Sequence, residues 1–157
     1  MPLHLDATLV PTRRRALKLA GLATLAAVLA PRMALATEAQ VADEIKKLFS
    51  GKAMGEGKIK LDLPEIAENG LVVPINLDVE SPMTEADFVK SVHVFADGNP
   101  LPQVLTYRFT PESGKASASA RMRLAQTQNV IAVAEMSNGQ LYSAKAQVKV
   151  TIGGCGG

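Results

Sequence analysis

From Ile59 to Ile152 the hydrophobic residues recur mainly at every second position, and this period constrains the fold more than any other feature of the sequence. A period of two places alternate side chains on opposite faces of a β-strand, whereas an amphipathic helix needs a period near 3.6. In the last segment, Val148, Val150 and Ile152 are expected to face inward. The pattern predicts an all-β domain of about seven strands, at residues 59–63, 71–79, 91–96, 105–109, 117–124, 130–136 and 141–152.

Turn residues separate these segments. Asn138-Gly139 is a strong signal for a tight hairpin, and further turns are expected at residues 97–100 and 111–114. Short strands at this spacing predict an antiparallel immunoglobulin-like β-sandwich, without the buried Trp and intersheet disulfide of antibody domains. A small antiparallel barrel is the alternative. Because Pro74 has no backbone N–H, the strand at 71–79 is expected toward a sheet edge.

One short helix is expected before the strands. Val41, Ile45 and Phe49 recur at helical spacing, and Gly51 follows them as a stop signal. Helix and strands together give a single domain at residues 37–152, which is close to the common size of one domain.

The first 36 residues have the features of an export signal. Arg13 and Arg14 lie in a basic segment, an apolar run follows at residues 19–30, and small residues up to Ala36 suit a signal peptidase. The apolar run is too short to span a bilayer of about 30 Å. Paired arginines followed by Leu and Lys resemble a twin-arginine signal. We therefore expect residues 1–36 to be removed after Ala36, and the mature protein to reach the periplasm without inserting into the membrane.

Cleavage after Ala36 would change the charge of the protein. The chain has 17 Lys and Arg against 15 Asp and Glu, and five of these basic residues and one acidic residue lie in the signal. The mature chain then has twelve basic and fourteen acidic residues, a net charge of −2, which does not favour nucleic acid or anionic membrane as a partner. Its one His and one Cys, His93 and Cys155, are too few for a zinc or haem site, so we expect no metal or cofactor of its own.

The chain ends in four glycines around one thiol: Gly153, Gly154, Cys155, Gly156 and Gly157. Apart from the cysteine, this segment has no side chain that could pack in a core. We expect a flexible arm that extends about 17 Å, at 3.3–3.6 Å per residue. Such a thin arm could enter a narrow pocket of another protein, which bulky neighbours of the thiol would prevent. Cys155 is therefore expected to hold a covalently attached group on which other proteins act.

Two other roles of Cys155 are open at this point. An unpaired cysteine in an oxidising compartment can form an intermolecular disulfide, which would make the domain a structural module. A thiol enzyme would need a base, and His93 is the only candidate in the mature chain. We expect His93 on a sheet face, and a flexible arm does not hold the fixed geometry that catalysis needs. The carrier role is therefore the preferred interpretation.

Seven segments of the mature chain have a family resemblance, at residues 63–70, 72–74, 95–100, 107–111, 123–128, 132–136 and 150–157. They resemble the SoxY family, the sulfur-carrier subunits of the thiosulfate-oxidising Sox system. The most specific segment is the last, because Gly-Gly-Cys-Gly-Gly at the C-terminus is the substrate arm of that family. A twin-arginine signal is also usual in the family.

The resemblance implies a fold, a chemistry and a set of partners. The family has an immunoglobulin-like fold and pairs with a second small β-protein, SoxZ. A c-type haem enzyme would join thiosulfate to Cys155, and a manganese hydrolase would then release sulfate. A molybdenum–haem sulfane dehydrogenase, where present, would oxidise the remaining sulfur. The chain would thus be a carrier and not an enzyme, and the haem, manganese and molybdenum cofactors would belong to its partners.

Overall fold

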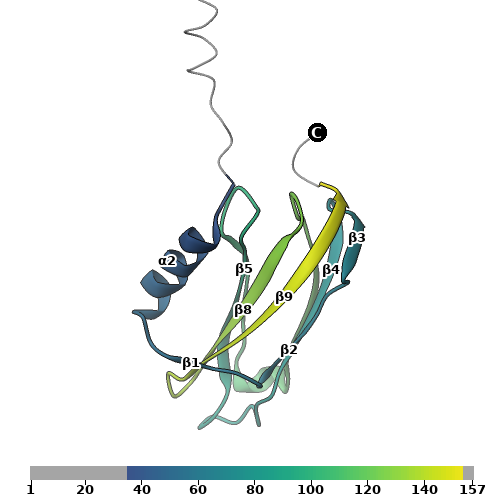
Figure 1. Ribbon diagram of the computed structural model, residues 1–157. Helices are drawn as coiled ribbons and strands as arrows, with labels where there is room; N and C mark the ends of the chain where they lie inside the picture. Colours follow the sequence, from purple (N-terminus) through teal and green to yellow (C-terminus); the bar gives the residue numbers. More distant parts are fainter. Residues whose placement is uncertain (1–34, 154–157) are drawn as a thin grey trace, which may run out of the picture. The chain divides into compact units, whose positions relative to one another are not determined.

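Two β-sheets face each other in the computed structural model, which describes residues 35–153 (Figure 1). The described strands are β1 (Met54–Gly55), β2 (Ile59–Asp62), β3 (Ile66–Asn69), β4 (Val73–Val79), β5 (Val89–Ala96), β6 (Gln103–Arg108), β7 (Ala116–Met122), β8 (Gln128–Met136) and β9 (Leu141–Ile152). One sheet has the order β1-β9-β8-β5-β6, with β3 also paired to β9, and the other has the order β2-β4-β7. The predicted all-β, immunoglobulin-like sandwich is confirmed.

Two short strands were not expected from the alternation. β1 has two residues and β3 has four, so neither is long enough to show a clear period of two. Both pair with β9 in the parallel direction, whereas the pairs among the longer strands are antiparallel. The sandwich therefore has two parallel additions to the predicted antiparallel framework.

The prediction that Pro74 places its strand at a sheet edge is wrong. β4 is the central strand of the smaller sheet, between β2 and β7. The pairing registers explain how the proline is accommodated. β2 pairs only with residues 76–79 of β4, whereas β7 pairs along the whole strand and places Arg121 opposite Pro74. At Pro74 the strand has a single neighbour, so the local environment is that of an edge.

The main core lies between the two sheets, and most of the alternation is confirmed. In β4 the four apolar side chains Val73, Ile75, Leu77 and Val79 are at most 3% exposed, and the residues between them are exposed. They pack in one cluster with residues of the larger sheet, such as Val92 and Val94. The expectation for Ile152 is wrong, because its side chain is 68% exposed. β9 extends beyond its pairing with β8 there and leaves the core.

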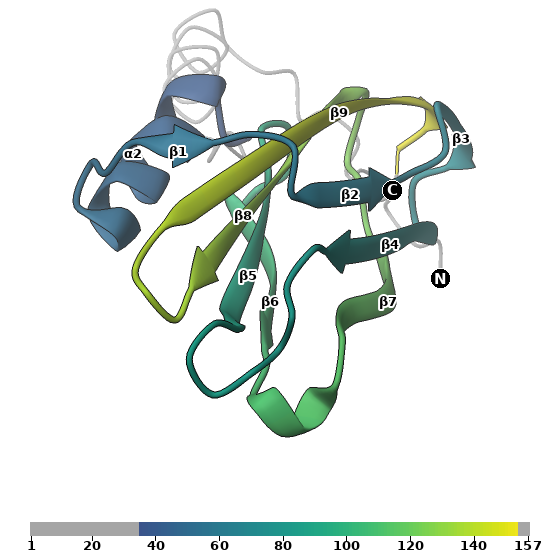
Figure 2. The ribbon, with the colours of Figure 1, turned by 90° about the horizontal axis from the view of Figure 1, so that it is seen from below.

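The predicted helix is α2 (Glu38–Phe49), which covers the outer face of the larger sheet (Figure 2). Thr37 caps its N-terminus through a capping box with Gln40. Val41, Ile45 and Phe49 pack against a second apolar cluster on the sheet, formed by Phe95, Val133 and Leu141. The central strands are therefore buried on both faces, which explains why their outward positions are also apolar.

Candidate carrier site

The described part of the predicted site is the place where the C-terminal segment leaves the domain. It consists of residues 149–153, the end of β9 and Gly153, which we call the root. Cys155, Gly154, Gly156 and Gly157 lie outside the described residues, as do Arg13 and Arg14 of the predicted signal. Gly153 and Ala36 are described. Ala36 is buried, and its backbone N–H donates to the Asn99 carbonyl at 2.7 Å. Cleavage after Ala36 stays a prediction.

Backbone hydrogen bonds hold β9 to its last residue. β8 pairs with β9 only as far as Val148. Beyond that point β9 pairs with β3, with Ala67 opposite Val150 and Asn69 opposite Ile152 (Figure 1). The N–H of Gly70, which follows β3, donates to the Ile152 carbonyl at 2.7 Å. The end of β9 is thus held in place by regular backbone hydrogen bonds.

Two threonine hydroxyls add to this attachment. Thr127 Oγ1 accepts a hydrogen bond from the Val150 N–H at 3.0 Å and donates to the Val150 carbonyl at 3.4 Å. Thr151 Oγ1 donates to the Glu68 carbonyl at 2.8 Å. The hydroxyls connect the end of β9 to the segment before β8 and to β3, so the root is held by two separate parts of the chain.

Gly153 lies tightly against the backbone of Ala125. A Cβ at position 153 would overlap the Ala125 carbonyl oxygen, which is part of a backbone and cannot rotate away. From the sequence alone, this glycine is expected to make the arm flexible. The structure gives it a steric reason, since only a residue without a side chain fits where the chain leaves the domain.

Two buried amide side chains fix the loop that contains Ala125. Asn99 is 7% exposed and Gln128 is 4% exposed. Asn99 Nδ2 donates to the Arg123 carbonyl at 2.8 Å, and Asn99 Oδ1 accepts from the Ala125 N–H at 2.9 Å and from Gln128 Nε2 at 3.0 Å. Gln128 Oε1 in turn accepts from the Gly98 N–H at 2.7 Å. We call Asn99 and Gln128 the amide pair.

The amide pair and Thr127 were missed as site residues by sequence reasoning. Asn99 was placed only in a turn, and Gln128 and Thr127 had no chemical signal of their own. The only pointer was that the segments 95–100 and 123–128 are among those that resemble the SoxY family.

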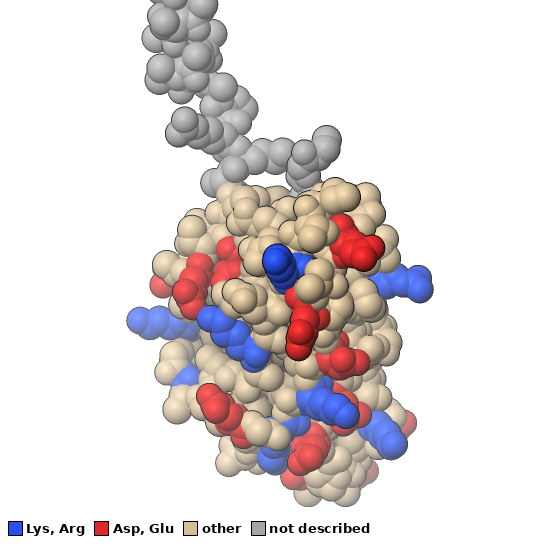
Figure 3. Space-filling view, turned by 45° about the vertical axis from the view of Figure 1, so that its right-hand side comes forward, with Lys and Arg blue, Asp and Glu red and all other residues tan. Residues whose placement is uncertain are grey.

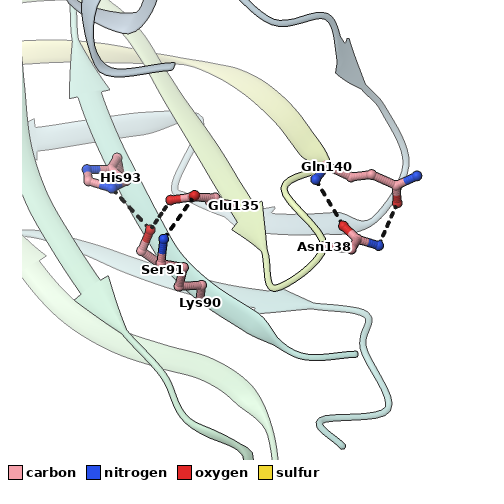
Figure 4. A network of polar contacts seen from close by, with 6 residues as sticks. All are labelled: Lys90, Ser91, His93, Glu135, Asn138 and Gln140. Carbon is pink, nitrogen blue, oxygen red and sulfur yellow. Dashed lines mark hydrogen bonds and ion pairs between the residues drawn. The ribbon is translucent and has the colours of Figure 1, made fainter. Parts of the chain in front are cut away.

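His93 lies on the sheet face, as expected, and is half-buried beneath α2. Phe49 of α2 packs edge-on against its ring, with the ring centroids 5.4 Å apart. Ser91 Oγ lies 3.2 Å from Nε2 (Figure 4). Gln103 Nε2 lies 3.1 Å from Nδ1 on the other side of the ring. Both ring nitrogens therefore have partners within the sheet.

The surroundings of His93 do not resemble an activated base. Burial lowers the pKa of His93, and the nearby Glu135 only partly opposes this effect. The Glu135 carboxylate accepts hydrogen bonds from Ser91 and Lys90 and makes none with the imidazole (Figure 4). The arrangement lacks the carboxylate–imidazole contact that orients a catalytic histidine. A structural role, in which His93 packs against Phe49 and is hydrogen-bonded within the sheet, accounts for these contacts.

Residues 35–153 offer no metal site and no membrane-spanning helix. In that range no three His, Cys, Asp or Glu side chains gather to hold an ion, and no helix is long and apolar enough to cross a bilayer. On the face shown in Figure 3, basic and acidic side chains are interspersed. This face has no broad area of one charge that would attract nucleic acid.

Comparison with known proteins identifies the family. The family model described as "Sulfur oxidation protein SoxY" matches residues 45–155, a range that includes the whole root and Cys155. The chain belongs to the SoxY family. The sulfur carrier protein SoxY from Chlorobium limicola f thiosulfatophilum is 32% identical, with a TM-score of 0.62, over 74% of this chain and 100% of that one. The family resemblance of the sequence is thus confirmed. As a member of this family, the present chain is a sulfur carrier and not an enzyme.

More distant structures share only the fold. A superoxide reductase (neelaredoxin) from Ignicoccus hospitalis is 15% identical, with a TM-score of 0.54, over 74% of this chain and 94% of that one. Its E23A variant is 16% identical, with the same TM-score of 0.54, over 59% of this chain and 79% of that one. A search of curated protein sequences finds no match.

Proposed function

We propose that this protein carries thiosulfate-derived sulfur in the periplasm as covalent adducts on Cys155. The observation that carries the proposal is the family match, which extends to Cys155, the only cysteine of the chain. The geometry supports it, because β9 is hydrogen-bonded to its last residue and Gly153 fits closely where the chain leaves the domain. The root is firmly held as far as Gly153, two residues before Cys155, and is therefore suited to presenting the thiol to other proteins.

The chemistry of this carrier consists of steps catalysed by partner enzymes. In loading, a new S–S bond joins the Cys155 sulfur to the outer sulfur of thiosulfate. The thiol loses its proton, and an electron pair passes to a c-type haem enzyme. In the next step a manganese hydrolase uses water to break the S–S bond to the sulfonate group, releasing sulfate and a proton and leaving a persulfide on Cys155. A molybdenum–haem sulfane dehydrogenase, where present, then oxidises the outer sulfur.

The proposal assigns no catalytic group to the chain itself. The Cys155 sulfur is the attachment point, and Gly154 and Gly156 leave room around it for an enzyme pocket. A SoxZ-type subunit is the partner that forms the heterodimer, as the family implies. A twin-arginine signal that includes Arg13 and Arg14, removed after Ala36, is the proposed route to the periplasm.

Reconstitution with the partner enzymes tests the function. The Cys155→Ser variant should fold, bind its partner subunit and fail to support thiosulfate oxidation. Gly154→Val and Gly156→Val keep the thiol but crowd it, so enzymatic loading should slow while intermolecular disulfides form as in the wild type. If Cys155→Ser sustained oxidation, the carrier proposal would be wrong. If reduction of a disulfide dimer abolished function in the wild type, Cys155 would have a structural role instead.

A further inference from the structure

The fixed root restricts the distance that Cys155 can travel. Residues 149–152 are held by β3 and Thr127, and Gly153 is pressed against Ala125. Cys155 is two residues beyond Gly153, so its Cα lies at most about 7 Å from that of Gly153, at 3.3–3.6 Å per residue. An enzyme that reacts with the thiol must therefore approach the surface of the domain around the end of β9.

Three large apolar side chains are exposed at this place. Ile152 is 68% exposed, Leu71 is 46% exposed and Val72 is 58% exposed. They belong together because the N–H of Gly70, directly before Leu71, is hydrogen-bonded to the Ile152 carbonyl. We call Leu71, Val72 and Ile152 the apolar rim.

The rim is not explained by the packing of the domain. Leu71 and Val72 occupy the turn between β3 and β4, a position where polar residues are usual. Ile152 continues the inward set of β9 beyond the point where β8 pairs with it, so it has no core to face. Neighbouring exposed hydrophobic residues with no role in the core are typical of interaction sites.

We propose that the apolar rim is the docking surface for the enzymes that load and unload Cys155. This inference rests on the proposed carrier function. The occupant follows from the chain length, because only the protein whose active site holds Cys155 must lie against the rim during every transfer. A small apolar contact also suits a carrier that several enzymes engage in turn, since small interfaces belong to weak, transient complexes.

The test is a charge placed in the rim, with a matched control elsewhere. In Val72→Lys the substituted side chain points to solvent, so folding should be preserved. The control is Leu48→Lys, whose side chain is 44% exposed on α2, away from the end of β9 (Figure 1). Each variant is prepared in complex with the partner subunit, and loading by the c-type haem enzyme with thiosulfate is followed by mass spectrometry as carrier concentration varies.

We expect Val72→Lys to raise the KM for the carrier about tenfold, with kcat at saturation close to that of the wild type, because an apolar contact at the centre of a small interface is lost. The rate at which a small thiol reagent modifies Cys155 should not change, and Leu48→Lys should match the wild type in all assays. An unchanged KM for Val72→Lys would overturn the proposal. Loss of the partner subunit from this variant would also overturn it, by assigning the rim to the subunit interface. A wild-type complex that takes no adduct would instead refute the carrier function.

Discussion

Replacement of Asn99 by alanine should destabilise the whole domain, because its side chain makes three hydrogen bonds in a buried position. The Arg123 carbonyl, the Ala125 N–H and one Gln128 Nε2 proton all lose their partner in Asn99→Ala. At about 1 kcal/mol of net stability per hydrogen bond, the free energy of unfolding should fall by about 3 kcal/mol. For a domain of this size, that loss lowers Tm by about 10 °C.

Urea unfolding monitored by circular dichroism measures this loss, and Asn76→Ala is the matched control. The Asn76 side chain is exposed, and its amide donates to a single partner, Asp62, at 3.2 Å. Its replacement should therefore change the free energy of unfolding by less than about 0.5 kcal/mol. If the free energy of unfolding of Asn99→Ala lay within about 1 kcal/mol of the wild-type value, the amide pair would not be what fixes the loop that contains Ala125.

Three further predictions concern the root and the helix-covered face. Gly153→Ala pushes a methyl group against the Ala125 carbonyl, so unfolding free energy should fall by about 1–3 kcal/mol in denaturant titrations; wild-type stability would mean that the root has room. Thr127→Val removes both hydrogen bonds to Val150 and Thr127→Ser keeps them, so amide exchange at Val150 should accelerate only in the valine variant; equal exchange rates in the two variants would show that the Thr127 hydroxyl does not hold β9. Burial lowers the pKa of His93 below 6.5, so the unfolded state binds more protons just below that pH and stability should fall as pH drops through 6.5. In urea titrations between about pH 5 and 7, the free energy of unfolding of His93→Gln should depend less steeply on pH than that of the wild type. Equal slopes for the two proteins would contradict this prediction.

The alternation predicted the long strands because each of them faces the core on one side. In β4 the burial pattern follows the sequence residue by residue. The alternation does not predict segments whose structure is decided by other forces. β1 and β3 are defined by pairing with β9 and not by their own apolar content, and Ile152 continues a period of two after the core has ended. Phe95 is fully buried on the face opposite the main core because α2 covers it.

The candidate site was predictable only at its chemical centre. A single cysteine between glycines is visible in the sequence, and it led to a carrier rather than to an enzyme. The root was not visible, because the hydrogen bonds of the amide pair and Thr127 join residues that are more than twenty positions apart. Asn99 also occupies a turn where asparagine is common for local reasons, so its long-range contacts have no distinct sequence signal.

Mass spectrometry of the mature protein tests the central claim most directly. The protein is purified without reductant from cells that are oxidising thiosulfate, and the peptide that contains Cys155 is analysed. The carrier account predicts thiosulfonate and persulfide adducts on Cys155 that disappear on reduction. A bare thiol, or only a disulfide between two copies of the chain, found while thiosulfate is being consumed, would contradict it.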